Sequence, residues 1–137
     1  MNRNMALERV GRARVAYMLQ LRGWKVGEAF DDGYDLLASH LKKKKLCLIE
    51  VKAMDISNRS TGVNLSAPLS KSEARACTHV IAYVEPQGLV FIARKQSVLT
   101  RGGNIFAAID KSGSLRKTRK GSRSFAPFMD RWDELLR

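Results

Sequence analysis

The sequence of 137 residues is poor in residues that cross-link chains or bind soft metals, since it has only two cysteines and two histidines. Cys47 and Cys77 lie in apolar segments, so we expect reduced, buried thiols, and the cysteine and histidine spacings match no zinc motif. No apolar stretch reaches the length of about 18 residues that a transmembrane helix needs. The first residues, Met-Asn-Arg-Asn-Met-Ala, form no apolar signal core, which predicts a cytoplasmic protein without a membrane partner.

Acidic residues are also scarce. The chain has 13 Asp and Glu against 25 Lys and Arg, which gives a net charge of +12 and a pI near 10.2. This excess predicts a polyanionic partner, most simply nucleic acid. An anionic membrane surface is the weaker alternative, because no amphipathic helix rich in Lys and Arg stands out. The apolar share of 45% is ordinary for one globular domain of this length.

The strongest chemical signal lies in the apolar run over residues 46–52. A continuous apolar run of this length is typical of a strand that is buried on both faces. Its charged residues, Glu50 and Lys52, are two positions apart and therefore point to the same side of the strand. Because unpaired buried charge is costly, two charges at this place indicate a function.

A second acidic segment precedes this strand. Asp35 opens another strand-like run, and a solvated turn of four lysines separates the two strands. If the strands pair as a hairpin, Asp35 lies close to Glu50 and Lys52 at one edge of the sheet. Two ionised carboxylates repel each other, and a hard divalent cation is the usual means of holding both in the charged form.

An Asp followed by Glu-x-Lys at this spacing resembles the PD-(D/E)xK nuclease superfamily. Here the pattern is Asp35, then Glu50-Val51-Lys52, and Tyr34 stands where the name-giving proline would be. The resemblance extends over roughly residues 5–100 and implies a metal-dependent DNA endonuclease that hydrolyses phosphodiester bonds. It implies that Asp35, Glu50 and the Val51 carbonyl hold Mg²⁺ or Mn²⁺. Lys52 would then orient or deprotonate the attacking water, or neutralise charge in the transition state.

The resemblance also implies a single α/β domain with a restriction-endonuclease-like core. Its central mixed β-sheet would be flanked by helices in the order αβββαβ. Residues 1–100 would form the core, and residues 101–137 a basic arm and a C-terminal helix of the same domain. The sequence pattern predicts a helix at residues 5–22, capped by Gly23, with Leu7, Val10, Met18 and Leu21 on its apolar face. It further predicts strands at about 24–29, 34–40, 45–53, 79–84 and 89–93, and a helix that begins at Lys71.

Glu8 lies at the border of the apolar face of the first helix. The resemblance implies that Glu8 completes the active site by holding a second metal ion or an outer-shell water. The alternative is a surface ion pair between Glu8 and Arg12. Arg14 could meet a phosphate or the acidic cluster, or lie on the surface. The pair Asp31–Asp32 belongs to a turn, although either residue could replace Asp35 as a ligand.

Basic residues outside the acidic cluster are candidates for DNA contacts. Residues 54–69 are predicted to form a long polar loop after the charged strand, either in contact with DNA or free. The sequence Ser70-Lys71-Ser72-Glu73 matches a capping box, and its lysine either meets a phosphate or is solvated. Residues 101–124 are predicted to form a flexible basic arm or hairpin for the phosphate backbone, with a plain charged loop as the alternative. The predicted DNA-binding residues are Arg59, Lys71, Arg101, Lys111, Arg116, Lys117, Arg119, Lys120 and Arg123.

Within the superfamily, the arrangement is most similar to the Holliday-junction resolvases and the small homing endonucleases. Both groups are oligomers, which predicts a homodimer or a higher homo-oligomer. No residue indicates the shape of the substrate, so a general endonuclease is the preferred interpretation. A catalytically inactive nucleic-acid-binding protein on the same fold is the alternative, against which the complete set of Asp35, Glu50 and Lys52 argues. An RNA-binding protein of ribosomal type would not explain the charged end of a buried strand.

Overall fold

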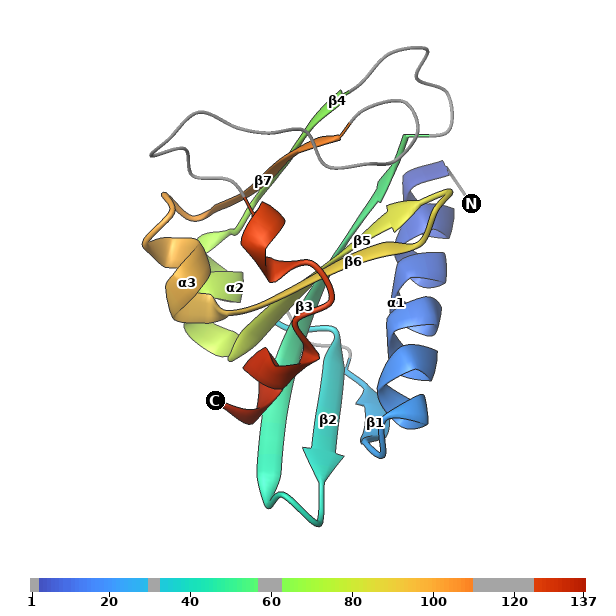
Figure 1. The fold of residues 1–137 in the computed structure, drawn as a ribbon, viewed down its shortest axis with the longest axis vertical. Coiled ribbons are helices and arrows are strands. Elements are labelled where there is room, and N and C mark those ends of the chain that lie inside the picture. The colour runs from blue at the N-terminus through green and yellow to red at the C-terminus, as the bar shows by residue number, and fades with distance from the viewer. Residues whose placement is uncertain (1–2, 30–32, 57–62, 110–124) are drawn as a thin grey trace.

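A five-stranded mixed sheet forms the centre of the computed structural model, which describes residues 3–29, 33–56, 63–109 and 125–137 (Figure 1). Its strand order is β1-β2-β3-β5-β6, with β3 and β5 parallel and the other neighbours antiparallel. A separate ribbon pairs β4 with β7. The predicted single α/β domain with a mixed central sheet is therefore confirmed. The elements are α1 (Arg3–Leu21), β1 (Lys25–Glu28), β2 (Leu36–His40), β3 (Lys45–Asp55), β4 (Val63–Pro68), α2 (Lys71–Ala76), β5 (His79–Glu85), β6 (Leu89–Arg94), α3 (Lys95–Leu99), β7 (Asn104–Ile109) and the 3₁₀ helices η1 (Ala126–Phe128) and η2 (Trp132–Leu136).

The strand β3 has one apolar face and one charged face. Cys47, Ile49 and Val51 pack with α1 and the C-terminal segment in one core cluster. Glu50 and Lys52 point to the opposite face, because side chains alternate along a strand. On that side a second cluster joins β5 and β6 to α3, β7 and η1. The sheet is thus packed on both faces, and the charged pair lies on the face opposite the α1 face.

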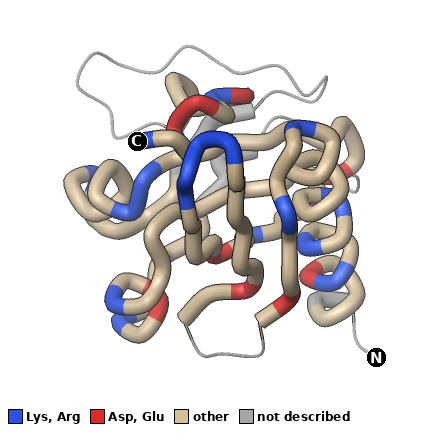
Figure 2. The backbone as a smooth tube through the Cα atoms, turned by 90° about the horizontal axis from the view of Figure 1, so that it is seen from below, with Lys and Arg blue, Asp and Glu red and all other residues tan. Residues whose placement is uncertain are grey.

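The hairpin of β2 and β3 has the predicted form. Leu36 lies opposite Ile49, and His40 lies opposite Lys45 at the far end. The lysine run between the strands is an exposed turn, which Figure 2 shows as a continuous blue segment. This register places Asp35, the residue before Leu36, beside the middle of β3, where Glu50 lies.

The helix α1 packs on the sheet through a face that differs in part from the predicted one. Val15 and Leu19 are fully buried, whereas Val10 and Leu21 are 41% and 65% exposed. The packed face of α1 includes Gly11, where an added Cβ atom would lie 2.7 Å from the Cβ atom of Ala53 in β3. Because glycine has no apolar side chain, the apolar pattern did not indicate this close approach of the helix to the sheet.

The structure corrects the prediction for the second half of the chain. The predicted loop over residues 54–69 is wrong for β4 and for the end of β3, which continues to Asp55. Residues 104–109 of the predicted flexible arm form β7, and α3 precedes them without having been predicted. Because β4 and β7 pair only with each other in the part of the chain described, no local pattern indicated them. Residues 110–124 of the arm lie outside the described residues.

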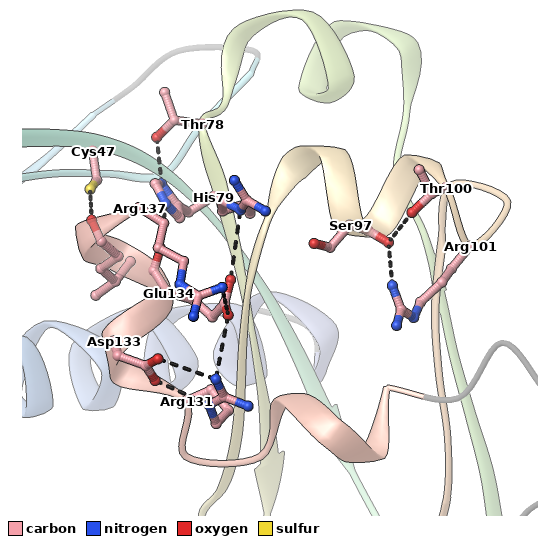
Figure 3. A network of polar contacts seen from close by, with 12 residues as sticks. Cys47, Thr78, His79, Ser97, Thr100, Arg101, Arg131, Asp133, Glu134 and Arg137 are labelled. Atoms are coloured by element: carbon pink, nitrogen blue, oxygen red, sulfur yellow. Dashed lines mark hydrogen bonds and ion pairs between the residues drawn. The ribbon is translucent and has the colours of Figure 1, made fainter.

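The C-terminal segment docks on the core of its own chain (Figure 3). It forms two short 3₁₀ helices in place of the predicted single helix, and Leu135 is fully buried. The Glu134 carboxylate lies 3.7 Å from the guanidinium groups of Arg94, Arg131 and Arg137. Both cysteines are free and buried, as predicted. No helix in the described ranges has both the length and the apolar character needed to cross a bilayer.

His79 joins this segment to the sheet and is 95% buried, with an exposed fraction of only 5%. Its Nε2 atom lies 3.0 Å from the Glu134 carbonyl oxygen, and its Nδ1 atom lies 2.8 Å from the Thr78 hydroxyl. Burial lowers the pKa of His79 from its ordinary value of 6.5. The folded protein therefore keeps the imidazole neutral at a pH where the unfolded chain binds a proton.

We expect the free energy of unfolding to fall as the pH drops below about 6.5, because the unfolded chain gains the proton first. Substitution His79→Gln keeps an N–H donor for the Glu134 carbonyl and removes the titration. Urea unfolding between pH 7.5 and 5.0 should therefore show a smaller loss for the variant than for the wild type. Parallel pH profiles for the two proteins would contradict this role for His79.

Candidate active site

Asp35 extends the β2–β3 ladder with its side chain. Its backbone N–H donates to the Ile49 carbonyl at 2.8 Å, and its Oδ2 atom accepts from the Val51 N–H at 2.8 Å. The β2 strand begins one residue later, so a carboxylate occupies the place where the next backbone partner would be. The predicted neighbourhood of Asp35 and Glu50 is present in the structure.

The Val51 carbonyl faces the same edge of β3 as the Asp35 carboxylate. In a strand, the N–H and C=O of one residue point to the same side. Since the Val51 N–H meets Asp35, the carbonyl of Val51 is also directed to this edge. The three oxygen donors predicted for a metal ion, from Asp35, Glu50 and Val51, therefore come from one short section of the hairpin.

Glu50 is a carboxyl group that the protein buries, with 7% of the residue exposed. Burial raises its pKa to about 9, and the hydrogen bond with Glu73 and the negative charge of Asp35 act in the same direction. In the protein alone, Glu50 is therefore protonated at neutral pH. Because its surroundings disfavour a negative charge, Glu50 would ionise only with a cation close by in addition to Lys52.

Lys52 pairs mainly with a residue that sequence analysis treated only as a helix cap. Its Nζ atom lies 2.9 Å and 2.8 Å from the two carboxylate oxygens of Glu73 in α2. The nearest oxygen of Glu50 lies farther from Nζ, at 3.7 Å. Although burial opposes it, the hydrogen bonds from Glu50 and Lys52 lower the pKa of Glu73 to about 2. Glu73 is thus the ionised partner of Lys52 in this cluster.

The helix α1 contributes Arg12 to the site. The Arg12 guanidinium lies 4.0 Å from Asp35 Oδ1. Glu8, one turn earlier in the helix, is exposed. Arg14 lies near Tyr83 on the α1 face of the sheet. The role of Glu8 as an outer ligand stays a prediction.

The predicted DNA-binding residues divide into three groups. Lys71 is exposed at the start of α2, two residues before Glu73. Arg101 is partly buried, since its guanidinium lies 4.6 Å from the centre of the Phe128 ring and donates to the Ser97 carbonyl at 3.1 Å. The remaining members of the set lie outside the described residues, namely Arg59, Lys111, Arg116, Lys117, Arg119, Lys120 and Arg123.

Two residues of the site were missed by sequence reasoning. Glu73 was recognised as part of a capping box, but the sequence does not show that α2 begins beside β3. Arg12 was considered only as a surface partner of Glu8. Within the described ranges, no group of three or more His, Cys, Asp or Glu side chains forms a ready-made metal site. The described site therefore offers at most two carboxylates to one cation.

Comparison with known proteins supports the fold. No protein-family model and no curated protein matches the sequence. The structure is similar to that of a bacterial homing endonuclease, I-Ssp6803I, with a TM-score of 0.73 and 16% sequence identity. The similarity covers 99% of this chain and 93% of the endonuclease chain. At this identity it establishes a homing-endonuclease-like fold.

Gly33 lets the segment before Asp35 lie against α2. An added Cβ atom would clash with the Cβ atom of Ala76 and lie 3.0 Å from the Ser72 carbonyl oxygen. The substitution Gly33→Ala should therefore push α2 from the site and lower the free energy of unfolding by about 1–3 kcal/mol. Denaturant unfolding measures this loss. The matched control is Gly27→Ala in β1, where an added Cβ atom meets nothing within 4 Å; equal stabilities of the two variants would contradict the prediction.

Proposed function

We propose that the protein is a metal-dependent endonuclease that hydrolyses phosphodiester bonds in DNA. One observation carries the proposal: β3 places Glu50, with Lys52 beside it, close to Asp35 at the edge of the sheet where β2 begins. A structural protein has no evident need for this buried cluster, which leaves Glu50 protonated at neutral pH. The homing-endonuclease-like fold, the Asp35…Glu50-Val51-Lys52 pattern and the net charge of +12 support the same function.

The donor set fits Mg²⁺ or Mn²⁺. Asp35, Glu50 and the Val51 carbonyl offer oxygen atoms only, which hard cations prefer. Mg²⁺ keeps several waters and commonly binds one or two carboxylates together with substrate phosphates, so a third protein carboxylate is not required. A divalent cation would also offset the repulsion that the negative charges of Asp35 and Glu73 exert on an ionised Glu50. Glu8 would contribute through an outer-shell water or a second ion.

The residues of this chain have separate tasks in the proposed reaction. Asp35 and Glu50 would hold the cation, which when bound would polarise the scissile phosphate and make a water more acidic. Lys52 donates hydrogen bonds to the attacking water or to the phosphate oxygens and offsets the negative charge that develops there. Lys71, exposed at the start of α2, contacts a neighbouring phosphate.

The pattern and the fold together support a place in the PD-(D/E)xK superfamily, near the homing endonucleases or the junction resolvases. Cutting both strands of a duplex needs two sites, which favours a homodimer or a higher homo-oligomer. The second candidate is a DNA-binding protein without turnover. It is favoured by the bidentate pairing of Lys52 with Glu73, which occupies the proposed catalytic ammonium.

A cleavage assay tests the proposed function. Wild type with Mg²⁺ or Mn²⁺ should cut plasmid, linear duplex or four-way junction DNA, and EDTA should abolish cutting. We expect Lys52→Ala to lower the cleavage rate about 100-fold or more, because a charge-stabilising donor is lost. Cutting of one of the three DNA forms alone would identify the substrate class.

The matched control is Lys43→Ala, which removes the same charge from the exposed hairpin turn. This variant should cut at a rate within about threefold of the wild-type rate, since surface charges contribute weakly. Binding of DNA by both proteins without any cutting would support the binder without turnover. Equal cleavage by wild type and Lys52→Ala would contradict the assigned site.

A further inference from the structure

Glu73 hydrogen-bonds with Glu50 and also joins the start of α2 to Lys52. As the third residue of α2, it completes a capping box: the Ser70 N–H donates to Glu73 Oε1 at 2.8 Å, and the Glu73 N–H donates to Ser70 Oγ at 3.2 Å. The same carboxylate accepts two hydrogen bonds from Lys52 Nζ. One side chain thus caps the start of the helix and binds the ammonium group of the proposed site.

This arrangement differs from an ordinary capping box on a protein surface. The side chains of Glu73 and Lys52 are only 17% and 20% exposed. A lysine side chain has many rotamers, and fixing its ammonium in one position costs conformational entropy. Two carboxylate oxygens at 2.8 Å and 2.9 Å supply the hydrogen bonds that hold the group in a single direction.

The position of Glu73 is itself fixed by the backbone around it. The Ser70 backbone N–H orients the Glu73 carboxylate, and the close contact between Gly33 and Ala76 holds α2 against the segment before Asp35. The hydroxyl of Thr78, just after α2, accepts from the Leu48 N–H at 2.9 Å and so ties the other end of the helix to β3. Each end of α2 is therefore attached to the hairpin that carries the site.

We propose that Glu73 is a positioning residue, which holds the Lys52 ammonium beside Glu50. The inference rests on the proposed nuclease function and adds a residue to it from outside the Asp35…Glu50-Val51-Lys52 pattern. Glu73 acts through Lys52 and does not itself touch the substrate.

The substitution Glu73→Gln separates the two roles of this side chain. Glutamine occurs in capping boxes and keeps an oxygen for the Ser70 N–H, but it removes the negative charge and one acceptor from Lys52. We expect kcat to fall about 10- to 100-fold, as for a misplaced catalytic group, while KM for DNA stays within about threefold. Steady-state cleavage kinetics on the best DNA substrate measure both constants.

The control is Ser70→Ala, which removes the other half of the capping box and leaves the contact between Glu73 and Lys52 in place. This variant should unfold at a lower denaturant concentration than the wild type but keep its kcat. If Ser70→Ala lowers kcat as much as Glu73→Gln does, Glu73 acts only through the stability of α2, and the inference is overturned.

A double-mutant cycle checks the pair without cleavage. The effects of Lys52→Ala and Glu73→Gln on the unfolding equilibrium constant should depart from additivity by about threefold or more. Additive effects would show that the pair does not form. A wild type that cleaves no DNA would refute the proposed function, whereas an active wild type with an equally active Glu73→Gln variant would refute the positioning role alone.

Discussion

Burial of charge on β3 is the constraint on which the rest of the structure depends. Glu50 and Lys52 lie on a central strand, where a lone charge would be strongly unfavourable. The protein compensates with Glu73, whose carboxylate pairs with Lys52 and accepts a hydrogen bond from Glu50. That carboxylate is available only because α2 begins beside β3, which in turn requires the close contact at Gly33. The charged cluster therefore determines where a short helix must lie.

Both faces of the sheet are packed, and the proposed chemistry lies on one of them. On the α1 face, α1 and the C-terminal segment bury an apolar cluster, and His79 is held neutral beside it. On the other face, the charged cluster lies where β2 begins and β3 continues with β5 as its partner, so backbone and side-chain oxygens meet at one edge. The Asp35 carboxylate has two roles, because it continues the β-ladder and also belongs to the proposed metal site.

Sequence reasoning recovered the geometry that depends on local patterns. The placement of Asp35 beside β3, near Glu50, was predictable because a hairpin register follows from two strands and one turn. The capping box was predictable for the same reason. The contact between Glu73 and Lys52, which are 21 residues apart, depends on where α2 lies on the sheet. The ribbon of β4 and β7 and the approach of α1 at Gly11 were missed, because a distant strand partner and an absent side chain leave no periodic signal.

The central claim is that Asp35 and Glu50 share a divalent cation at the edge of β3. The most direct measurement is anomalous X-ray diffraction from crystals grown with Mn²⁺ and a DNA duplex. The account predicts an anomalous peak about 2.1 Å from an oxygen of each carboxylate. An ordered Asp35 and Glu50 with no peak between them, in crystals that contain bound DNA and Mn²⁺, would contradict it.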